Sequence, residues 1–427
     1  MITVFWRCVY TILFYLALPF IYLRLLWRSR RLPDLRQRLA ERLGFFTITK
    51  SDQQQTIWLH AVSVGETMAA IPLIKIVQQQ YPDIKIIITS TTSTGSQQVI
   101  KSFGDSIAHL YIPYDVPFAI KKFLRKIKPK IAIFMETELW PNYLYYLKKY
   151  HIPIMVANAR LSERSATNYA RVRNLIRPLI ANINLVAAQT EADSKRFYDI
   201  GLLPGRSVIT GNMKFDLKLP DTLDQQAQEL SQSLGQHRLI WIAASTHAGE
   251  EAPILAAHKQ IQQKFPDSLL LLVPRHPNRF AEIIALCRRD YRVALRSDRQ
   301  NCPPDTQIFI GDSMGELLLF YKVATVAFVG GSFVNVGGHN LIEPAACELP
   351  IISGPNLFNF THIAKLLQQA QALEIVDNSD TLATVVCRLF NNHIERQQRG
   401  ERARAVVAAN QGAVKKHVDL IRSLLTS

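Results

Sequence analysis

Short apolar runs alternate with longer amphipathic stretches along most of the chain, from residue 56 onward. The short runs are typical of buried strands, whereas the stretches between them have the spacing of helices with one apolar face. Repeated strand–helix–strand units predict a parallel sheet with helices on both faces. The expected strands lie at residues 56–60, 85–89, 109–113, 130–135, 152–157, 184–188 and 207–210, and then at 239–243, 269–273, 292–295, 306–310, 325–329, 350–353 and 374–376.

The alternation stops once, at residues 219–221 and the Gln-rich stretch after them, which we interpret as an interdomain linker. A length of 427 residues exceeds that of most single domains. We therefore predict two doubly wound α/β domains, residues 32–218 and 219–427, whose strand ends face a central cleft where ligands bind. Residues 394–425 are expected to be helical and basic, and the last helix either completes the second domain or packs back on the first.

An uncharged apolar segment precedes the first domain, at residues 8–23, and carries aromatic residues near both ends. It is slightly short for a spanning helix and contains Pro19, so a spanning helix, an interfacial helix and a buried helix of a soluble domain all remain open. No signal-peptide cleavage pattern follows it. Because arginines are frequent between residues 24 and 42, we expect residues 1–31 to be a retained anchor that leaves the rest of the chain in the cytoplasm.

The chain carries 50 Lys and Arg against 34 Asp and Glu, a net charge of +16, which indicates an anionic partner such as nucleic acid, an acidic membrane surface or a phosphorylated ligand. Aromatic and basic residues do not interleave as in single-strand-binding platforms, so a nucleic-acid partner is not expected. The five cysteines include no CxxC pair. The sequence also lacks the motifs DxD, HExxH, Walker A and G-x-S-x-G, and we expect neither a metal site nor a cofactor.

Residues 330–344 join an expected apolar strand, residues 323–329, to a helix expected to open at residues 340–346. Two glycine pairs remove side chains where the chain turns, and the free N–H groups of a helix start attract anions. This pattern predicts backbone that the phosphate of a nucleotide can approach closely. Glycine spacing alone is a weak signal, and a turn without chemical importance remains the alternative.

Carboxylates follow two expected strands of the first domain. Glu66 lies in the first turn of the helix after residues 56–60, where the helix dipole favours the ionised form that a general base needs, although glutamate there is also an ordinary helix cap. Glu136 and Glu138 follow the strand at residues 130–135. Strand alternation would point both the same way, so that one acts while the other orients it, unless they only cap the next helix.

Basic side chains follow later strands of the same domain. Arg160 and Arg164 come after the fifth strand and match either an acidic ligand or a solvated loop. Lys214 precedes the linker, where its ammonium group would reach a leaving phosphate or a substrate carboxylate, unless it is simply solvated.

Polar residues also follow the apolar strands of the second domain. The hydroxyl and amide groups of Ser245 and Thr246 and the guanidinium of Arg275 are expected to converge on phosphate. The corner at residues 312–316 suits contact with a base or a ribose, and Glu343 is placed to accept hydrogen bonds from two ribose hydroxyls.

Ten motifs together resemble those of the bacterial Kdo transferases, which add 3-deoxy-D-manno-oct-2-ulosonic acid from CMP-Kdo to the lipid A precursor. In the order and approximate spacing of that family they are HAVSVGE, TSTTSTG, PYD, METELWPN, NARLSERS, GNMKFD, STHAGEE, PRHP, GDSMGEL and GGSFVNVGGHNLIEPAA. The resemblance extends from the anchor to about residue 360. It implies a GT-B glycosyltransferase with two Rossmann-like domains, the first holding the lipid acceptor and the second holding CMP-Kdo as a co-substrate. It also implies a place on the cytoplasmic face of the bacterial inner membrane, at its anionic surface.

By the same resemblance, Glu66 is the general base that deprotonates the primary hydroxyl of the acceptor for in-line attack with inversion. Glu136 and Lys214 match positions that stabilise the transition state. The positions that match CMP-contacting segments are Pro274, Arg275, Met314, Gly315, Glu316, Asn340, Leu341, Ile342 and Glu343. Departures are mild, since Met213 replaces a common leucine and Ala248 a common glutamate. A nucleotide-sugar epimerase on the same fold and a membrane-bound nucleic-acid binder are the competing interpretations.

Overall fold

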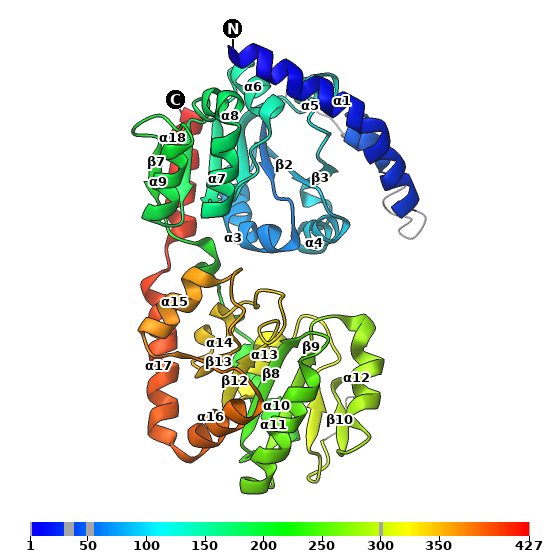
Figure 1. Ribbon diagram of the computed structural model, residues 1–427, viewed down its shortest axis with the longest axis vertical. Helices are drawn as coiled ribbons and strands as arrows, with labels where there is room; N and C mark the ends of the chain where they lie inside the picture. Colours follow the sequence, from blue (N-terminus) through cyan, green and yellow to red (C-terminus); the bar gives the residue numbers. More distant parts are fainter. Residues whose placement is uncertain (1, 30–37, 48–54, 299–301, 427) are drawn as a thin grey trace. The chain divides into compact units, whose positions relative to one another are not determined.

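The computed structural model describes residues 2–29, 38–47, 55–298 and 302–426. The chain divides into two compact units, Met1–Asp216 with Gln411–Ser427, and Leu217–Asn410. Each unit contains one seven-stranded parallel sheet with helices on both faces (Figure 1), which confirms the predicted pair of doubly wound α/β folds. Arg30, Arg31 and Arg36 of the expected basic cluster lie outside the described residues, as does the expected end of the anchor at residue 31.

The sheet of the first unit has the strand order β3-β2-β1-β4-β5-β6-β7. Its central strand β1 pairs in parallel with β2 and β4, so that Ile57 lies between Ile86 and Ile131. The strands are β1 Thr56–His60, β2 Lys85–Ser90, β3 Ala108–Tyr111, β4 Pro129–Met135, β5 Ile154–Ala159, β6 Leu185–Ala188 and β7 Ser207–Ile209. Strand order reverses between β1 and β4, and ligands of such folds bind at the carboxyl ends of the strands beside this switch point.

Helices cover both faces of this sheet. On one face, Trp58 meets Phe123 and Tyr143 at ring-centroid distances of 5.0 and 5.4 Å, within a core that α5, α6, α8 and α9 complete. On the other face, α3, α4 and α18 bury Leu59 with Val418. The helices are η1 Leu39–Leu43, α3 Val64–Gln80, α4 Ser93–Phe103, η2 Gly104–Ser106, α5 Pro117–Ile127, α6 Pro141–Lys149, α7 Glu163–Arg171, α8 Arg173–Ile180, α9 Glu191–Asp199, η3 Met213–Asp216 and α18 Ala413–Thr426.

The sheet of the second unit has the order β10-β11-β9-β8-β12-β13-β14, with its switch point between β8 and β12. Its strands are β8 Ile240–Thr246, β9 Leu269–Pro274, β10 Val293–Leu295, β11 Ile308–Ile310, β12 Val326–Val329, β13 Ile351–Ser353 and β14 Leu373–Ile375. Its helices are α10 Leu223–Leu234, α11 Glu251–Lys264, η4 Pro277–Arg279, α12 Phe280–Cys287, η5 Arg296–Asp298, α13 Leu317–Val323, α14 Ile342–Ala346, α15 Thr361–Gln369, α16 Ser379–Asn391 and α17 His393–Ala409. One face packs on α11, α12 and α16, and the other on α10 and α13.

Helix α1, Ile2–Ser29, packs along the first unit against α6 and α8 (Figure 1). The Tyr10 hydroxyl donates to the Asp115 carboxylate at 2.9 Å, and Arg7 donates to the Asn142 side-chain oxygen at 3.1 Å. Asp115 also accepts the backbone N–H of Asn142 at 3.0 Å. One side of α1 is therefore tied to buried polar groups of the unit.

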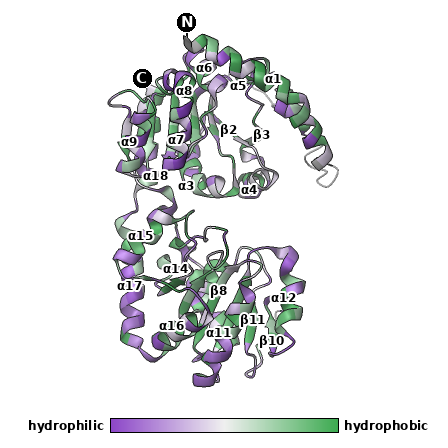
Figure 2. Cartoon of the chain, viewed as in Figure 1, coloured by the Kyte–Doolittle hydropathy of each residue, from purple (hydrophilic) through white to green (hydrophobic). Residues whose placement is uncertain are grey.

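The opposite side of α1 is exposed and apolar. Leu13, Leu16 and Phe20 are 61%, 64% and 75% exposed, and green dominates this helix in Figure 2. Residues Val4–Trp27 are long and apolar enough to cross a membrane by length and composition. The helix thus combines a docked side with an exposed apolar side.

The stretch expected to be helical at residues 394–425 is two helices, α17 and α18, separated at residues 410–412. Gly412 has a φ of 97°, a left-handed conformation that side chains disfavour, and this turn ends the helical run. The Asp216 carboxylate accepts the N–H groups of Gly412 and Val414 at 2.5 Å each. These bonds fix the start of α18 to the first unit, where the helix contacts α3 and η3.

Candidate functional site

Glu66 lies at the carboxyl edge of the first sheet, in the first turn of α3. Strand β1 ends at His60, and Ser63 is the N-cap residue, whose side chain accepts the Glu66 N–H at 3.3 Å. The Glu66 carboxylate accepts the Val62 N–H at 2.8 Å and the Ser63 hydroxyl at 3.0 Å. The carboxylate therefore closes the start of the helix, as the capping interpretation predicts.

The surroundings of Glu66 favour its protonated form. Only 9% of the residue is exposed. Burial is the main cause that raises the pKa of this carboxyl to about 7; the Val62 N–H acts in the opposite direction, and the carboxylates of Glu136 and Glu138 raise it further. A carboxyl group with a pKa near 7 is well matched to accepting a proton at neutral pH.

Glu136 and Glu138 do not share one face of a strand. Strand β4 ends at Met135, and Glu136 adopts a left-handed backbone conformation with a φ of 57°. The expectation from strand alternation is wrong, because the chain turns between the strand and the second carboxylate. Glu138 accepts the indole N–H of Trp140 at 2.9 Å, and burial raises its pKa. Glu136 raises the pKa of both Glu66 and Glu138, so the three carboxylates form one electrostatic cluster.

Lys214 joins this cluster from the short helix η3. Its ammonium nitrogen lies 3.5 Å from a carboxylate oxygen of Glu136, and the two side chains are 26% and 25% exposed. A cation at this distance offsets part of the repulsion among the carboxylates. Glu66, Glu136 and Lys214, which the sequence predicts to be catalytic, therefore lie together at the carboxyl edge beside the β1–β4 switch point.

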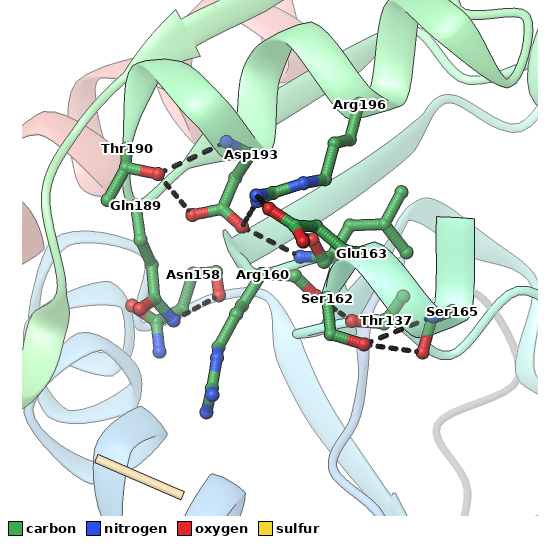
Figure 3. Close-up of polar contacts among 11 residues, drawn as sticks. Thr137, Asn158, Arg160, Ser162, Glu163, Ser165, Gln189, Thr190, Asp193 and Arg196 are labelled. Atoms are coloured by element: carbon green, nitrogen blue, oxygen red, sulfur yellow. Dashed lines mark hydrogen bonds and ion pairs between the residues drawn. The ribbon is translucent and has the colours of Figure 1, made fainter. Parts of the chain in front are cut away.

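Asn158 fixes the turn that carries Lys214. It is fully buried near the end of β5, with a φ of 51°. Its side-chain oxygen accepts the Met213 N–H at 3.0 Å, and its backbone oxygen accepts the Gln189 amide at 2.9 Å, the latter drawn in Figure 3. Its own N–H donates to the imidazole of His417 in α18 at 2.8 Å. The sequence motifs gave no role to Asn158 or His417; a histidine among the apolar positions of an amphipathic helix was the available signal.

The loop after β5 is held in place by its neighbours (Figure 3). The Thr137 hydroxyl donates to the Arg160 carbonyl, and the Leu161 N–H donates to the Asp193 carboxylate at 2.9 Å. The guanidinium of Arg160 points away from Asp193 in Figure 3. Arg164 is exposed on the first turn of α7. These contacts fix the backbone of the loop.

The glycine loop after β12 is closed by a carboxylate. Glu250, fully buried, accepts the N–H groups of Gly331, Ser332 and Phe333 at 2.6, 2.9 and 2.9 Å. Helix α14 begins only at Ile342, later than expected. The amide groups of residues 331–333 already donate to an anionic side chain, so the approach of phosphate to the backbone of residues 330–344 stays a prediction for the rest of the loop. Glu250 belongs to the motif STHAGEE, which was the sequence signal for this interaction.

Three histidines gather at the carboxyl ends of the neighbouring strands β9, β8 and β12. The Nε2 atoms of His247 and His339 are 2.8 Å apart, and the His276 ring meets the His247 ring edge-on at a centroid distance of 5.1 Å. Burial is the main cause that lowers the pKa of both His247 and His339, and neighbours that include Arg275 lower both further. The pKa of His339 falls to about 4. These histidines lie within the motifs STHAGEE, PRHP and GGSFVNVGGHNLIEPAA, which predicted no role for them.

The residues predicted to converge on phosphate differ in their contacts. Ser245 has a left-handed backbone with a φ of 58°, near the end of β8. The Thr246 hydroxyl donates to Glu251 at 3.0 Å, and Glu251 also binds Arg279 at 2.7 Å, so this hydroxyl is engaged within the protein. Pro274 ends β9, and Arg275 after it is exposed.

Asn340 and Glu343 form a pair at the start of α14. The Asn340 amide donates to the Glu343 carboxylate at 3.0 Å, and its oxygen accepts the Ile342 N–H at 3.2 Å. Burial raises the pKa of Glu343, and Arg275 lowers it, which places both residues in one electrostatic neighbourhood. The side chains of Leu341 and Ile342 are fully buried, so only their backbone groups are available to a ligand.

The corner at Met314, Gly315 and Glu316 follows β11, next to the edge strand β10. Glu316 forms an ion pair with Arg296 at 2.7 Å and accepts a hydrogen bond from the Ser313 hydroxyl. Met314 is 59% exposed, and Gly315 has a φ of 91°. A cavity of about 590 Å³ lies beside Gly315 and Glu316, against α10. This corner therefore belongs to a different part of the sheet edge than the histidines.

Comparison with known proteins identifies relatives over the whole chain. Residues 37–217 match the family model described as 3-deoxy-D-manno-octulosonic-acid transferase (kdotransferase). The chain is 42% identical over 422 residues to the 3-deoxy-D-manno-octulosonic acid transferase of Haemophilus influenzae, covering 98% of this chain and 99% of that protein.

Two solved structures show how widely the fold is shared. A glycosyltransferase from Rickettsia africae superimposes with a TM-score of 0.55 at 16% identity, covering 87% of this chain and 99% of that one. A UDP-GlcNAc 2-epimerase from Neisseria meningitidis superimposes with a TM-score of 0.59 at 11% identity, covering 86% and 100%. At such low identities these likenesses show the fold alone, so they do not favour an epimerase.

Proposed function

Because the chain belongs to the family of the 3-deoxy-D-manno-octulosonic acid transferases, we propose that it moves Kdo from CMP-Kdo to the primary hydroxyl of the lipid A precursor, lipid IVA, in the synthesis of the lipopolysaccharide core. Kdo transfer is the activity of the family. The finer assignments of acceptor and stereochemistry follow from the resemblance of the sequence motifs, and the contacts described above support the residue roles.

Glu66 is the general base of this proposal. Its carboxylate takes the proton of the acceptor hydroxyl while the hydroxyl oxygen bonds to the anomeric carbon of Kdo. The bond from that carbon to the phosphate oxygen breaks, and CMP leaves with the electron pair. In-line attack of this kind inverts the anomeric configuration. The observation that carries the proposal is the cluster of Glu66, Glu136 and Lys214, in which the pKa of Glu66 is raised to about 7.

Lys214 and Glu136 act on the transition state. The ammonium group of Lys214 stabilises negative charge that develops on the donor, and Glu136, 3.5 Å away, holds that ammonium in place. A preorganised cation avoids reorganisation at the moment of reaction. No metal ion takes part in this scheme, and the activity should persist in the presence of a chelator.

The second unit holds the CMP part of the donor. Arg275 supplies a guanidinium group for phosphate, and Glu343 lies in its electrostatic neighbourhood. Ser245, Thr246, Pro274, and the segments at residues 314–316 and 340–343 supply the remaining contacts. For Leu341 and Ile342 these are backbone contacts, because both side chains are buried.

Helix α1 holds the enzyme on the cytoplasmic face of the bacterial inner membrane. The hydrogen bonds of Tyr10 and Arg7 to the first unit support a helix that lies in the interface, since a helix docked on the protein cannot be surrounded by lipid. Its exposed apolar side would enter the acyl region. The net charge of +16 favours an anionic membrane surface.

The deciding experiment is mass spectrometry of the lipid made from purified enzyme, CMP-Kdo and a phosphorylated tetraacyl disaccharide. We expect Glu66→Gln to lower transfer by at least ~100-fold and to leave CMP binding unchanged. Glu163→Gln is the matched control, because that carboxylate is exposed and pairs with Arg196. Near-normal turnover of Glu66→Gln would remove the base from the scheme. An isomerised sugar formed from CMP-Kdo without acceptor would instead indicate the epimerase alternative.

A further inference from the structure

The first amide groups of the glycine-rich loop after β12 are already engaged within the protein. The N–H groups of Gly331, Ser332 and Phe333 all donate to the Glu250 carboxylate. A phosphate placed there would compete with a buried anion for the same donors. Positive charge and free donors for a phosphate must therefore come from other residues at this edge of the sheet.

His247 and His339 meet edge to edge. Their Nε2 atoms are 2.8 Å apart, their ring planes differ by 10°, and their centroids are 5.0 Å apart. Two rings stacked face to face could not bring ring atoms so close, so the rings are nearly coplanar and share one Nε2–H···Nε2 hydrogen bond. One nitrogen of the pair donates and the other accepts. Both rings are only partly buried.

The charges around this pair are mostly positive. His276 and Arg275 act on both rings, and Arg279 and the Glu250 carboxylate also act on His247. Burial and these neighbours lower the pKa of both rings, so the pair is neutral at pH 7 in the absence of an anion. An anion placed between the rings and Arg275 would reverse this balance, because it favours the protonated forms.

We propose that His247 and His339, together with Arg275, form the subsite of the second unit that binds the phosphate group of the nucleotide. The inference rests on the proposed function, in which this unit holds CMP-Kdo. A phosphate oxygen replaces the hydrogen bond between the two rings. The ring nitrogen that had accepted takes one proton from solvent, and each Nε2–H then donates to phosphate. The guanidinium of Arg275 supplies the remaining charge.

The location supports this assignment. The two histidines follow β8 and β12, on either side of the switch point of this sheet, and Arg275 follows the neighbouring strand β9. Ligands of doubly wound sheets bind at such carboxyl ends. The subsite also explains why a closed glycine loop is compatible with nucleotide binding.

The test is calorimetric titration of the full-length protein with CMP, cytidine and inorganic phosphate, for the wild type and for His247→Gln, His339→Gln and Arg275→Gln. Glutamine keeps an amide donor of similar length but no charge. We expect each substitution to weaken CMP binding by about 10-fold, as for loss of a hydrogen bond to a charged group, and to leave cytidine affinity within about 2-fold. His393→Gln, at an exposed histidine on α17, should bind like the wild type.

The ligands separate the possible failures. If the wild type binds CMP no more tightly than cytidine, both the subsite and the assignment of the donor to this unit are overturned. If the wild type binds CMP more tightly than cytidine, and the variants keep this difference in full, only the subsite is overturned. If inorganic phosphate binds as tightly as CMP, and the substitutions weaken its binding equally, the occupant is not the nucleotide. The subsite would then be a site for free phosphate. Arg275 is exposed, so its variant remains informative if a histidine variant fails to fold.

Discussion

The imidazole of His417 accepts the backbone N–H of Asn158 at 2.8 Å, and so joins the last helix of the chain to the strand end behind the proposed catalytic lysine. The other ring nitrogen lies 2.7 Å from the Ala413 carbonyl. It must therefore carry the proton, which leaves Nε2 free to accept. Asn158 in turn accepts the Met213 N–H, directly before Lys214. The position of Lys214 thus depends on a helix nearly two hundred residues later.

His417→Ala should impair both folding and catalysis. It leaves the N–H of Asn158 buried without an acceptor, which costs about 1–3 kcal/mol of unfolding free energy. The turn at Met213 would also loosen, so kcat should fall more than KM changes, and hydrogen exchange at residues 213–216 should accelerate.

His417→Gln is the matched variant, because its side-chain oxygen can still accept. It should recover most of the stability and most of kcat. If His417→Ala were destabilised but turned over at the wild-type rate, His417 would have a structural role only.

The same histidine makes stability depend on pH. Burial lowers the pKa of His417 from 6.5 to about 4 in the folded chain. Between these values the unfolded chain binds the proton and the folded chain does not, so this contribution to stability is lost as pH falls from about 6.5 towards 4. The difference in unfolding free energy between wild type and His417→Gln should therefore shrink or change sign over this range. A difference that is constant with pH would contradict the lowered pKa.

The sequence predicted the fold well because parallel strands buried on both faces are continuous apolar runs. Each of the fourteen expected runs contains or overlaps an observed strand. The observed strand and helix boundaries differ from the expected ones where a proline or a glycine changes the backbone. Strand β5 begins at Ile154 rather than residue 152, after Pro153, and continues to Ala159. The break between α17 and α18 was missed because Gly412 lies in a long stretch of otherwise helical composition.

The candidate site was predictable only in part. Motifs and strand ends placed Glu66, Glu136 and Lys214 at the same edge of a sheet. Contacts between side chains that are distant in sequence, however, produce no periodic pattern of residues from which they could be predicted. The Glu250 carboxylate reaches the amide groups of residues 331–333, some eighty positions away. Strand alternation failed for Glu138, because a left-handed residue, Glu136, turns the chain immediately after β4.

Replacement of Glu250 should open the glycine loop. Its carboxylate accepts the N–H groups of residues 331–333 and that of His247 at 2.9 Å, so Glu250→Ala would leave several buried donors unsatisfied. We expect a loss of about 3 kcal/mol in the stability of the second unit. Hydrogen exchange at residues 331–333 measures this locally.

Glu251→Ala is a useful comparison for Glu250→Ala, since Glu251 binds Thr246 and Arg279 and does not contact the loop amides through the hydrogen bonds described. It should leave exchange at residues 331–333 nearly unchanged. Equal acceleration in both variants would show general loosening of the unit rather than loss of one carboxylate.

The exposed side of α1 should determine membrane binding. Simultaneous replacement of Leu13, Leu16 and Phe20 by serine removes three exposed apolar side chains from α1 without touching Tyr10 or Arg7. Because a buried side chain of this size contributes about 1.5–3 kcal/mol, partition onto vesicles of anionic phospholipid should fall by at least ~10-fold. Co-flotation with vesicles measures the partition.

The control for α1 replaces three exposed apolar residues elsewhere in the first unit, Leu203, Val208 and Ile209, by serine. This variant should float with vesicles as the wild type does. If the two triple variants lost binding equally, the membrane contact would not be specific to α1.

The acid limb of the pH–rate profile should report Glu66. Transfer requires its ionised form, so kcat/KM should rise with pH up to about 7 and then level off. The Glu136 carboxylate raises this pKa, and Glu136→Gln should therefore move the limb to lower pH even though the rate itself falls through weaker positioning of Lys214. Glu138→Gln should shift the limb in the same direction by a smaller amount, since Glu138 contributes less. Steady-state kinetics between pH 5 and pH 9 gives the midpoint of each limb, and unchanged midpoints in both variants would mean that the titrating group is not Glu66.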